Sequence, residues 1–468
     1  MRRAQRNFES RSGEVTSLLD KRGGRIVMAR LDSGFLAHVG RSPGGPAPVA
    51  FEDVASGLLR IVHREVVIRF KPSIPERRRR AILGWFGFVV RRRNVFIHDQ
   101  VIACHPGGKY AGEELIAVSN LLTTLDEIAL ATPNFISQYR RQTPPFILPQ
   151  EWHLGSTGLD VYEAWKITTG ASGIVVAVLD DGVDVDHLNL KGNIWRNPDP
   201  GARDQIGRDF FLPDGHPDHF NPRPKRFQFP FDRTKGNDIH GTACAGLIAA
   251  GGFKEGSVGV APGCRLLPVR IFQGDALVSD ERVADAIRYA AIHADILSCS
   301  WAGSLSLDVQ QALHDAGELG RGGRGSAIFC AAGNDGGEVS FPARDTHAIA
   351  VGAVTDLGQR ADYSNFGPEI AVVAPSSGGA RAIFTTDVSI PGRGFNPDGL
   401  YTHRFGGTSA AAALAAGTGA LVLSVHPGLS REELKELLQS TADESGEGCR
   451  RVNAGRAVGE ALKRRKLE

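Results

Sequence analysis

The sequence shows neither an excess of one charge nor a long uninterrupted apolar run. Its 54 basic and 52 acidic side chains leave a formal net charge of +2, so the charge balance does not indicate nucleic acid or another polyanion as a partner. No stretch free of charge reaches membrane-spanning length. The longest small-apolar run, residues 410–425, is interrupted by Gly417, Gly419 and Ser424 and is typical of a buried helix. We therefore expect no nucleic-acid partner and no membrane span.

The chain also lacks the marks of an exported, disulfide-bonded protein. The N-terminal segment MRRAQRNFESRSGEVTSLL begins with positive charge but has no apolar run of the kind a secretory signal needs. The six cysteines have neither paired nor metal-ligand spacing, which favours buried free thiols in a reducing compartment. Location stays open between the cytoplasm and export without a usual leader. The cysteines are Cys104, Cys244, Cys264, Cys299, Cys330 and Cys449.

A chain of 468 residues with 42% hydrophobic side chains predicts two or three domains. Residues 1–62 mix polar and Gly/Pro stretches, and we expect a small extension of unassigned role packed on the next domain. Residues 63–141 alternate apolar strands with two helical patterns in the order β-α-β-β-α-β, which predicts a ferredoxin-like α+β unit. The arginine runs 77–80 and 91–93 indicate a solvated helix face and strand end rather than a nucleic-acid site.

Residues 142–468 alternate apolar strands with helices. Segments such as GIVVAVLD, CRLLPVRIF and SAIFCAAGN are continuous apolar runs, as expected where both faces of a sheet are covered. We therefore predict an α/β domain with a mostly parallel sheet. Ser430 and Glu433 predict a capping box at the start of a late helix.

Four polar residues follow one another in this domain, each beside glycines. Asp180 ends an apolar strand, His240 and Ser409 begin small-residue helices, and Asn334 follows a buried strand. Taken singly, each has an ordinary structural explanation as a cap, a core histidine or a turn residue. Acyl transfer, however, needs an orienting carboxylate, a base, a nucleophile and an oxyanion donor, and the four supply one candidate for each.

The segments around these residues resemble the four sequence blocks of the subtilisin family. The blocks are VAVLDDGVDVDH, HGTACAGLIAA, AAGNDGG and GTSAAAALAAG, and the resemblance covers roughly residues 150–460. The doubled aspartate, the cysteine of the second block and the segment SCSW lean toward the kexin-like branch. Residues 63–141 resemble the propeptide inhibitor domain of the same family. The resemblance implies a doubly wound, mostly parallel subtilisin-like sheet, preceded by a small ferredoxin-like propeptide domain.

The resemblance also implies roles in a serine endopeptidase. Ser409 would attack the scissile carbonyl, His240 would exchange its proton, and Asp180 would orient His240. The Asn334 amide and the Ser409 N–H would hold the oxyanion. A stretch of four residues would pair with extended protein or peptide substrate as an added strand. These substrate-binding residues are Ser300, Trp301, Ala302 and Gly303. We expect no further partner besides the chain's own propeptide, and a monomer.

Some positions depart from the family pattern. Ala413 stands where the family has proline soon after the serine. Asn189 and Phe253 replace an aspartate and an asparagine expected of a calcium site, so we predict no cofactor and no metal ligand, with calcium left as a possibility. The acidic cluster that gives the kexin-like branch its specificity for paired basic residues is absent. Asp335 and Glu338 lie just past Asn334, and we expect them in a solvated loop, with a preference for a basic substrate side chain as the alternative.

Two other function classes predict different residues. A dead subtilisin fold used as a binding scaffold predicts loss of at least one of the four residues, and none is lost. A non-proteolytic hydrolase predicts a GxSxG elbow with serine first in chain order, whereas here the serine is last.

Two further expectations concern processing and a thiol. Pro144 and Pro145 favour an extended segment after the propeptide-like domain, which predicts self-cleavage between Gln138 and Leu148, first of all after Arg141. A permanent linker between two domains is the alternative. Cys244 lies four residues after His240 on a predicted helix, so both side chains should share one face.

Overall fold

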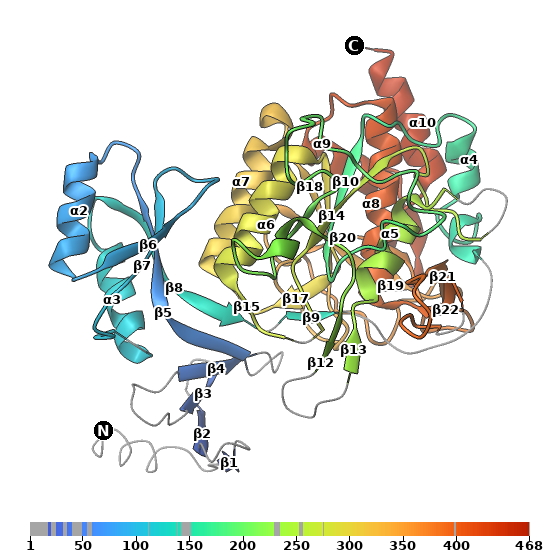
Figure 1. Cartoon of the computed structure of the whole chain (residues 1–468). Helices are drawn as coiled ribbons and strands as arrows, with labels where there is room; N and C mark the ends of the chain where they lie inside the picture. The colour runs from blue at the N-terminus through green and yellow to red at the C-terminus, as the bar shows by residue number, and fades with distance from the viewer. Residues whose placement is uncertain are drawn as a thin grey trace. The chain divides into compact units, whose positions relative to one another are not determined.

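The computed structural model describes residues 17–19, 25–30, 35–39, 49–53, 59–110, 112–137, 139–141, 151–228, 235–251, 256–274, 276–396 and 399–467 (Figure 1). The chain divides into two compact units. Unit 1 comprises residues 1–138 with the short segments 277–281 and 306–309, and unit 2 comprises the remainder.

Unit 1 contains the predicted β-α-β-β-α-β order. The elements are β5 (Leu59–Phe70), α2 (Glu76–Trp85), β6 (Val89–Arg93), β7 (Gln100–Cys104), α3 (Glu113–Thr123) and β8 (Ile128–Ser137). The antiparallel strands lie in the order β8-β5-β7-β6, so the first and last strands are neighbours, as in a ferredoxin-like sheet. Apolar residues of both helices are buried against the inner strand, among them Ile82 and Leu115 against Ile68.

The N-terminal extension contributes four short strands to the same sheet. They are β1 (Ser17–Leu19), β2 (Arg25–Arg30), β3 (Phe35–Val39) and β4 (Val49–Asp53). Each pairs antiparallel with the next, and β4 pairs with the first half of β5, with Val49 opposite Val62. The long strand β5 therefore crosses the boundary expected after residue 62 and belongs to both segments.

One arginine of the run 77–80 differs from the expectation. Arg79 is only 8% exposed, so the prediction of a solvated run is wrong at this position. Its Nη2 donates to Asp99 Oδ1 at 2.6 Å, its Nε donates to the Ile74 carbonyl at 2.6 Å, and its guanidinium lies 5.5 Å from the Phe70 ring centroid. Because a carboxylate and a carbonyl satisfy the guanidinium, the arginine can be buried while its neighbours stay in water.

Unit 2 is built on the predicted, mostly parallel sheet. The strand order is β11-β14-β10-β16-β18-β19-β20-β24-β23, and every pair in it is parallel except β24 with β23. After β10 the chain forms β11 and β14 on one side of β10, and the strands of this sheet from β16 onward lie on the other side of β10. The strand order therefore reverses at β10. These strands are β10 (Val175–Asp180), β11 (Arg208–Asp209), β14 (Arg265–Arg270), β16 (Ile296–Cys299), β18 (Ala327–Ala331), β19 (Ala348–Val354), β20 (Ile370–Pro375), β23 (Asp443–Ser445) and β24 (Cys449–Arg451).

Helices lie on both faces of this sheet, α6 and α7 on one and α5, α8 and α10 on the other (Figure 1). The helices are α4 (Val161–Trp165), α5 (His240–Ala249), α6 (Asp280–His293), α7 (Leu307–Gly323), α8 (Gly407–Val425), α9 (Arg431–Ser440) and α10 (Ala454–Arg465). The architecture confirms the doubly wound prediction. The predicted capping box of Ser430 and Glu433 is present at the start of α9.

Helix α8 is the one helix among the described residues that is long and apolar enough to cross a membrane, and 94% of its apolar window is buried inside the protein. This agrees with the predicted buried helix. Its alanines and glycines let α5 and the strands approach closely, since a side chain on Gly419 would lie 2.9 Å from the Phe329 ring.

The remaining elements are short. Three pairs of strands form small antiparallel ribbons: β12 (Arg226–Gln228) with β13 (Lys235–Asn237), β21 (Ile383–Thr386) with β22 (Tyr401–Phe405), and β9 (Tyr139–Arg141) with β17 (Trp301–Gly303). The one strand not yet described is β15 (Val278–Ser279). The 3₁₀ turns are η1 (Trp152–Leu154), η2 (Pro217–Phe220) and η3 (Gly446–Gly448).

Candidate active site

The sheet brings the predicted residues to its carboxyl edge. Asp180 is the last residue of β10, His240 is the first residue of α5, and Ser409 lies in the first turn of α8. Asn334 follows β18 after a two-residue connection. Ligand sites of doubly wound sheets gather at this edge, next to the strand where the order reverses, and that strand here is β10.

Asp180 and His240 form a buried pair. His240 Nδ1 lies 2.9 Å from Oδ1 and 2.8 Å from Oδ2 of Asp180, and both residues are about 1% exposed. The opposite ring nitrogen, Nε2, has no hydrogen-bond partner among the described residues. Burial raises the pKa of the Asp180 carboxyl, and the adjacent imidazole acts in the opposite direction. The carboxylate fixes the imidazole with Nε2 available as a proton acceptor.

Asp181 holds the start of α5 and was not identified as a functional residue from the sequence. Its carboxylate accepts hydrogen bonds from the main-chain N–H groups of Ile239 at 2.9 Å, His240 at 3.1 Å and Gly241 at 2.7 Å. One carboxylate thereby caps the helix that carries His240. A Cβ on Gly241 would lie 2.4 Å from the Gly182 carbonyl, so this approach requires glycine. The doubled aspartate in the sequence was the available signal.

Ser409 contacts the segment that follows β16. Its Oγ donates to the Ser300 carbonyl at 3.2 Å, and the Ser300 hydroxyl donates to the Ser409 carbonyl at 3.1 Å. Because His240 Nε2 has no partner in the described part of the chain, the hydroxyl and the imidazole are not hydrogen-bonded in this conformation. The structure thus joins Asp180 to His240 and Ser409 to Ser300.

The Asn334 amide has a defined orientation. Its Oδ1 accepts from the Thr408 N–H and from the Thr408 hydroxyl, both at 2.9 Å. Since a main-chain N–H can only donate, Oδ1 must face Thr408, and the Nδ2 donors face away from it. The Thr408 hydroxyl also accepts from the Gly333 N–H at 3.2 Å. Thr408 therefore orients Asn334, a role that sequence reasoning missed because threonine beside a serine looks like an ordinary helix start.

The predicted substrate-binding segment forms a strand that already has an extended neighbour. Strand β17 pairs antiparallel with β9, with Trp301 opposite Arg141, Ala302 opposite Arg140 and Gly303 opposite Tyr139. On this segment Gly303 N–H also donates to the Phe341 carbonyl at 2.9 Å. The main chain beside Ser300 is therefore able to bind a peptide by strand addition.

Cys244 lies where the helical spacing predicts. Its Sγ is 3.8 Å from His240 Nδ1, and the thiol is fully buried. Burial raises the pKa of the Cys244 thiol well above its usual value, so the sulfur is held as a neutral thiol beneath the imidazole.

The residues at the expected calcium position do not fit that ion. Asn189 is 7% exposed, and its side-chain Oδ1 accepts a hydrogen bond from the Tyr401 hydroxyl. Its main-chain carbonyl accepts from the Gly251 N–H at 2.7 Å. Calcium needs six to eight oxygen ligands, several of them charged, whereas here a hydrogen-bond donor faces the side-chain oxygen. Phe253 lies outside the described residues.

The model of the subtilase family matches residues 171–459. A calcium-dependent protease of Trichormus variabilis is 30% identical over 403 residues, which are 77% of this chain and 56% of the relative. A thermophilic serine proteinase of Bacillus sp. strain AK1 is 29% identical over 436 residues, which are 91% of this chain and 95% of the relative.

The predicted resemblance to the kexin-like branch has only loose support. Protease KEX1 of Kluyveromyces lactis is 31% identical over 316 residues, but these cover only 64% of this chain and 37% of the relative. Among solved structures, fervidolysin from Fervidobacterium pennivorans, a keratinolytic enzyme related to subtilisin, has the same fold with a TM-score of 0.61. The match is 20% identical and covers 84% of this chain and 60% of that chain. The chain spans 56% of the length of the calcium-dependent proteases that it matches.

Proposed function

Because the chain belongs to the subtilase family, we propose that it is a serine endopeptidase that uses Asp180, His240 and Ser409. The observation that carries the proposal is the buried Asp180–His240 pair, with Nδ1 engaged at 2.8 Å and Nε2 directed elsewhere. A histidine held in this way accepts a proton at Nε2 and no other atom, as a general base for a hydroxyl must.

The reaction proceeds through an acyl-enzyme. Ser409 Oγ leaves the Ser300 carbonyl, gives its proton to His240 Nε2 and attacks the scissile carbonyl carbon. His240 then gives that proton to the leaving amine, and water enters by the same route in reverse. Asp180 stabilises the imidazolium in both halves. The rotation of Ser409 is consistent with catalytic hydrogen bonds that tighten only when substrate is bound.

The developing oxyanion is held by two N–H groups. One is the Asn334 Nδ2, which Thr408 fixes through two contacts of 2.9 Å to Oδ1. The other is the Ser409 main-chain N–H, at the N-terminus of α8, where the helix dipole adds to the stabilisation. Because these donors are fixed before substrate arrives, no reorganisation is needed as charge develops.

The substrate is an extended stretch of protein or peptide that pairs with residues 301–303. Binding of this kind reads main chain more than side chains, so we expect activity on flexible segments and no strict requirement for paired basic residues. Since the Asn189 position does not suit calcium, we also expect that activity does not depend on an ion bound there, although relatives are named for such dependence.

Residues 63–141 act as a propeptide that the protease itself removes. The pairing of β9 with β17 supports this, because residues 139–141 then occupy the strand position that substrate would take. Arg141 faces Trp301, and Ser300 precedes Trp301 and contacts Ser409. In an antiparallel pair the scissile bond therefore falls just C-terminal to Arg141, after residue 141 or 142.

Expression of wild type beside Ser409→Ala, followed by intact mass measurement, tests the processing. Wild type should lose roughly 140 residues, as the length of the leading segment requires, and the alanine variant should stay whole. The sizes of the fragments report the bond that is cut. If both chains stay full length while wild type hydrolyses peptides, the leading unit is a permanent domain. If wild type cleaves neither itself nor any peptide, the fold serves as a scaffold.

A further inference from the structure

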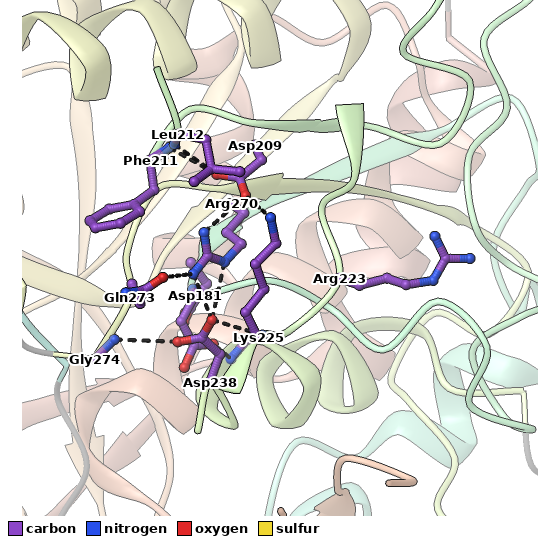
Figure 2. Close-up of polar contacts among 12 residues, drawn as sticks. Asp181, Asp209, Phe211, Leu212, Arg223, Lys225, Asp238, Arg270, Gln273 and Gly274 are labelled. Atoms are coloured by element: carbon purple, nitrogen blue, oxygen red, sulfur yellow. Dashed lines mark hydrogen bonds and ion pairs between the residues drawn. The ribbon is translucent and has the colours of Figure 1, made fainter. Parts of the chain in front are cut away.

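A buried cluster of charges gathers around Arg270, Asp209 and Asp238 (Figure 2). Arg270 is the last residue of β14 and is 0% exposed. Its Nη1 donates to Asp209 Oδ2 at 2.9 Å, and its Nη2 and Nε donate to Asp238 Oδ2 at 2.8 and 3.1 Å. Asp209 ends the neighbouring strand β11, while Asp238 lies two residues before His240. Figure 2 shows the guanidinium between the two carboxylates.

Arg270 connects the two segments that carry Asp180 and His240. In the parallel pair of β10 and β14, Arg270 is the register partner of Asp180, so its main chain is fixed at the same sheet edge. Its side chain reaches Asp238, from which the chain runs directly through Ile239 to His240. The Arg270 side chain thus links the strand edge that carries Asp180 to the segment that leads into His240.

Asp238 also accepts hydrogen bonds from two main-chain N–H groups. Its Oδ2 accepts from the Lys225 N–H at 2.9 Å, and its Oδ1 accepts from the Gly274 N–H at 3.3 Å. The residue is 1% exposed. Two loops and one strand thus donate hydrogen bonds to a single carboxylate, two residues before the histidine. Helix α5 does not need these bonds as a cap, because Asp181 already caps that helix.

The charge state of Asp238 responds to pH near neutrality. Burial raises the pKa of its carboxyl to about 7, the nearby Asp181 carboxylate acts in the same direction, and Arg270 opposes both. Two further groups lie nearby. The Lys225 ammonium lies 3.0 Å from the Asp209 carboxylate, and His240 is two residues after Asp238 in the chain. Protonation of Asp238 removes the charge that binds Arg270 while leaving the acceptors for Lys225 and Gly274.

We propose that Asp238 and Arg270 are positioning residues: their ion pair sets His240 against Asp180, and loss of the pair lowers turnover without lowering substrate affinity. The inference rests on the proposed peptidase function. A displacement of a catalytic group by about 1 Å costs up to a hundredfold in rate. Since Asp181 still holds the helix start, we expect a smaller loss.

The test is Asp238→Asn, which keeps the shape of the side chain and removes its charge. With a peptide substrate in excess, kcat should fall about tenfold and KM should stay within about twofold. The matched control is Asp218→Asn, which removes another carboxylate, 3.6 Å from Lys225 and 55% exposed, that does not contact Asp238. Its kcat should equal that of wild type.

The pH dependence separates positioning from folding. Like protonated Asp238, the variant lacks the negative charge that binds Arg270, so the ratio of kcat between wild type and variant should fall from about ten near pH 9 toward one near pH 5.5. Because both enzymes are assayed at every pH, effects that are common to both do not enter the ratio. Circular dichroism melts fix the assay temperature well below both unfolding midpoints.

Three outcomes overturn the proposal. These are a folded variant with wild-type kcat, a ratio that does not change with pH, and a loss that follows only the folded fraction. As a second variant, Arg270→Lys keeps the charge but loses the two contacts to Asp238, and it should lower kcat by a similar factor. Wild type that reacts with neither peptide nor a fluorophosphonate refutes the peptidase function itself, a result distinct from these.

Discussion

His153 should make the protein sensitive to mild acid. The residue lies in η1 with 0% exposure, and neither ring nitrogen has a hydrogen-bond partner among the described residues. Burial lowers the pKa of its imidazole to about 3 from the ordinary value of 6.5. The folded protein therefore keeps the ring neutral, whereas the unfolded chain binds a proton below pH 6.5. Above pH 6.5 both states keep the ring neutral, so the full free energy of unfolding is present. As the pH falls from 6.5 toward 3, only the unfolded chain binds the proton, and the free energy of unfolding decreases.

The magnitude follows from the two pKa values. Each pKa unit is worth about 1.36 kcal/mol, so lowering the pH from 7 to 5 should cost about 2 kcal/mol of unfolding free energy through His153 alone. His153→Leu should remove this loss, because leucine of similar size has no proton to bind. It should not weaken the fold at pH 7, since no hydrogen bond disappears.

Urea unfolding of the Ser409→Ala chain, followed by tryptophan fluorescence, provides the assay. The inactive background prevents self-digestion, and Trp152 lies beside His153 with ring centroids 6.5 Å apart. His403→Leu, an exposed histidine, is the control and should keep the acid sensitivity. If His153→Leu loses as much stability between pH 7 and pH 5 as its parent does, His153 is not buried and neutral, and the reasoning fails.

Three further predictions concern the site. Asn334→Ala should leave about a hundredth to a thousandth of kcat with little change in KM, measured with a peptide substrate, because one of two oxyanion donors is lost; a loss under threefold would contradict that role. A mercurial should inhibit wild type, and Cys244→Ser should relieve the inhibition, since an adduct 3.8 Å from the imidazole displaces it; an indifferent wild type would refute this geometry. Chelation of calcium should leave the melting temperature of unit 2 unchanged, whereas Tyr401→Phe should lower stability by about 1 kcal/mol through loss of the bond to Asn189; a large effect of the chelator would reverse the conclusion on calcium.

The sequence predicted the parts that depend on local pattern. Strands such as 175–180 are continuous apolar runs because the sheet is covered on both faces, and a strand of this kind places its last residue at the site. The strand and helix order of residues 63–141 followed from period-2 and helical spacing in the same way.

What the sequence did not predict depends on contacts between distant segments. Asp181 directly follows an apolar strand in the sequence, yet its carboxylate caps a helix that starts 59 residues later. Thr408 orients the side-chain amide of Asn334, which lies 74 residues earlier in the chain. Arg79 is buried because its guanidinium donates a hydrogen bond to Asp99, 20 residues later. Arg270 and Asp238, 32 residues apart, form an ion pair that no spacing in the sequence indicates. Pairings of this kind depend on the three-dimensional arrangement of the sheet edge.

The proposed activation of Ser409 as a nucleophile by His240 and Asp180 can be tested directly. Its most direct test is the reaction of the purified protein with a fluorophosphonate, followed by intact mass and peptide mapping. Wild type should gain one phosphonyl group, with loss of fluoride, on Ser409 and on no other residue. Ser409→Ala should gain none, and His240→Ala should react about a thousandfold more slowly or less. Labelling of Ser409→Ala at the wild-type rate, or an unlabelled wild type that still hydrolyses peptides, would contradict the proposed role of Ser409.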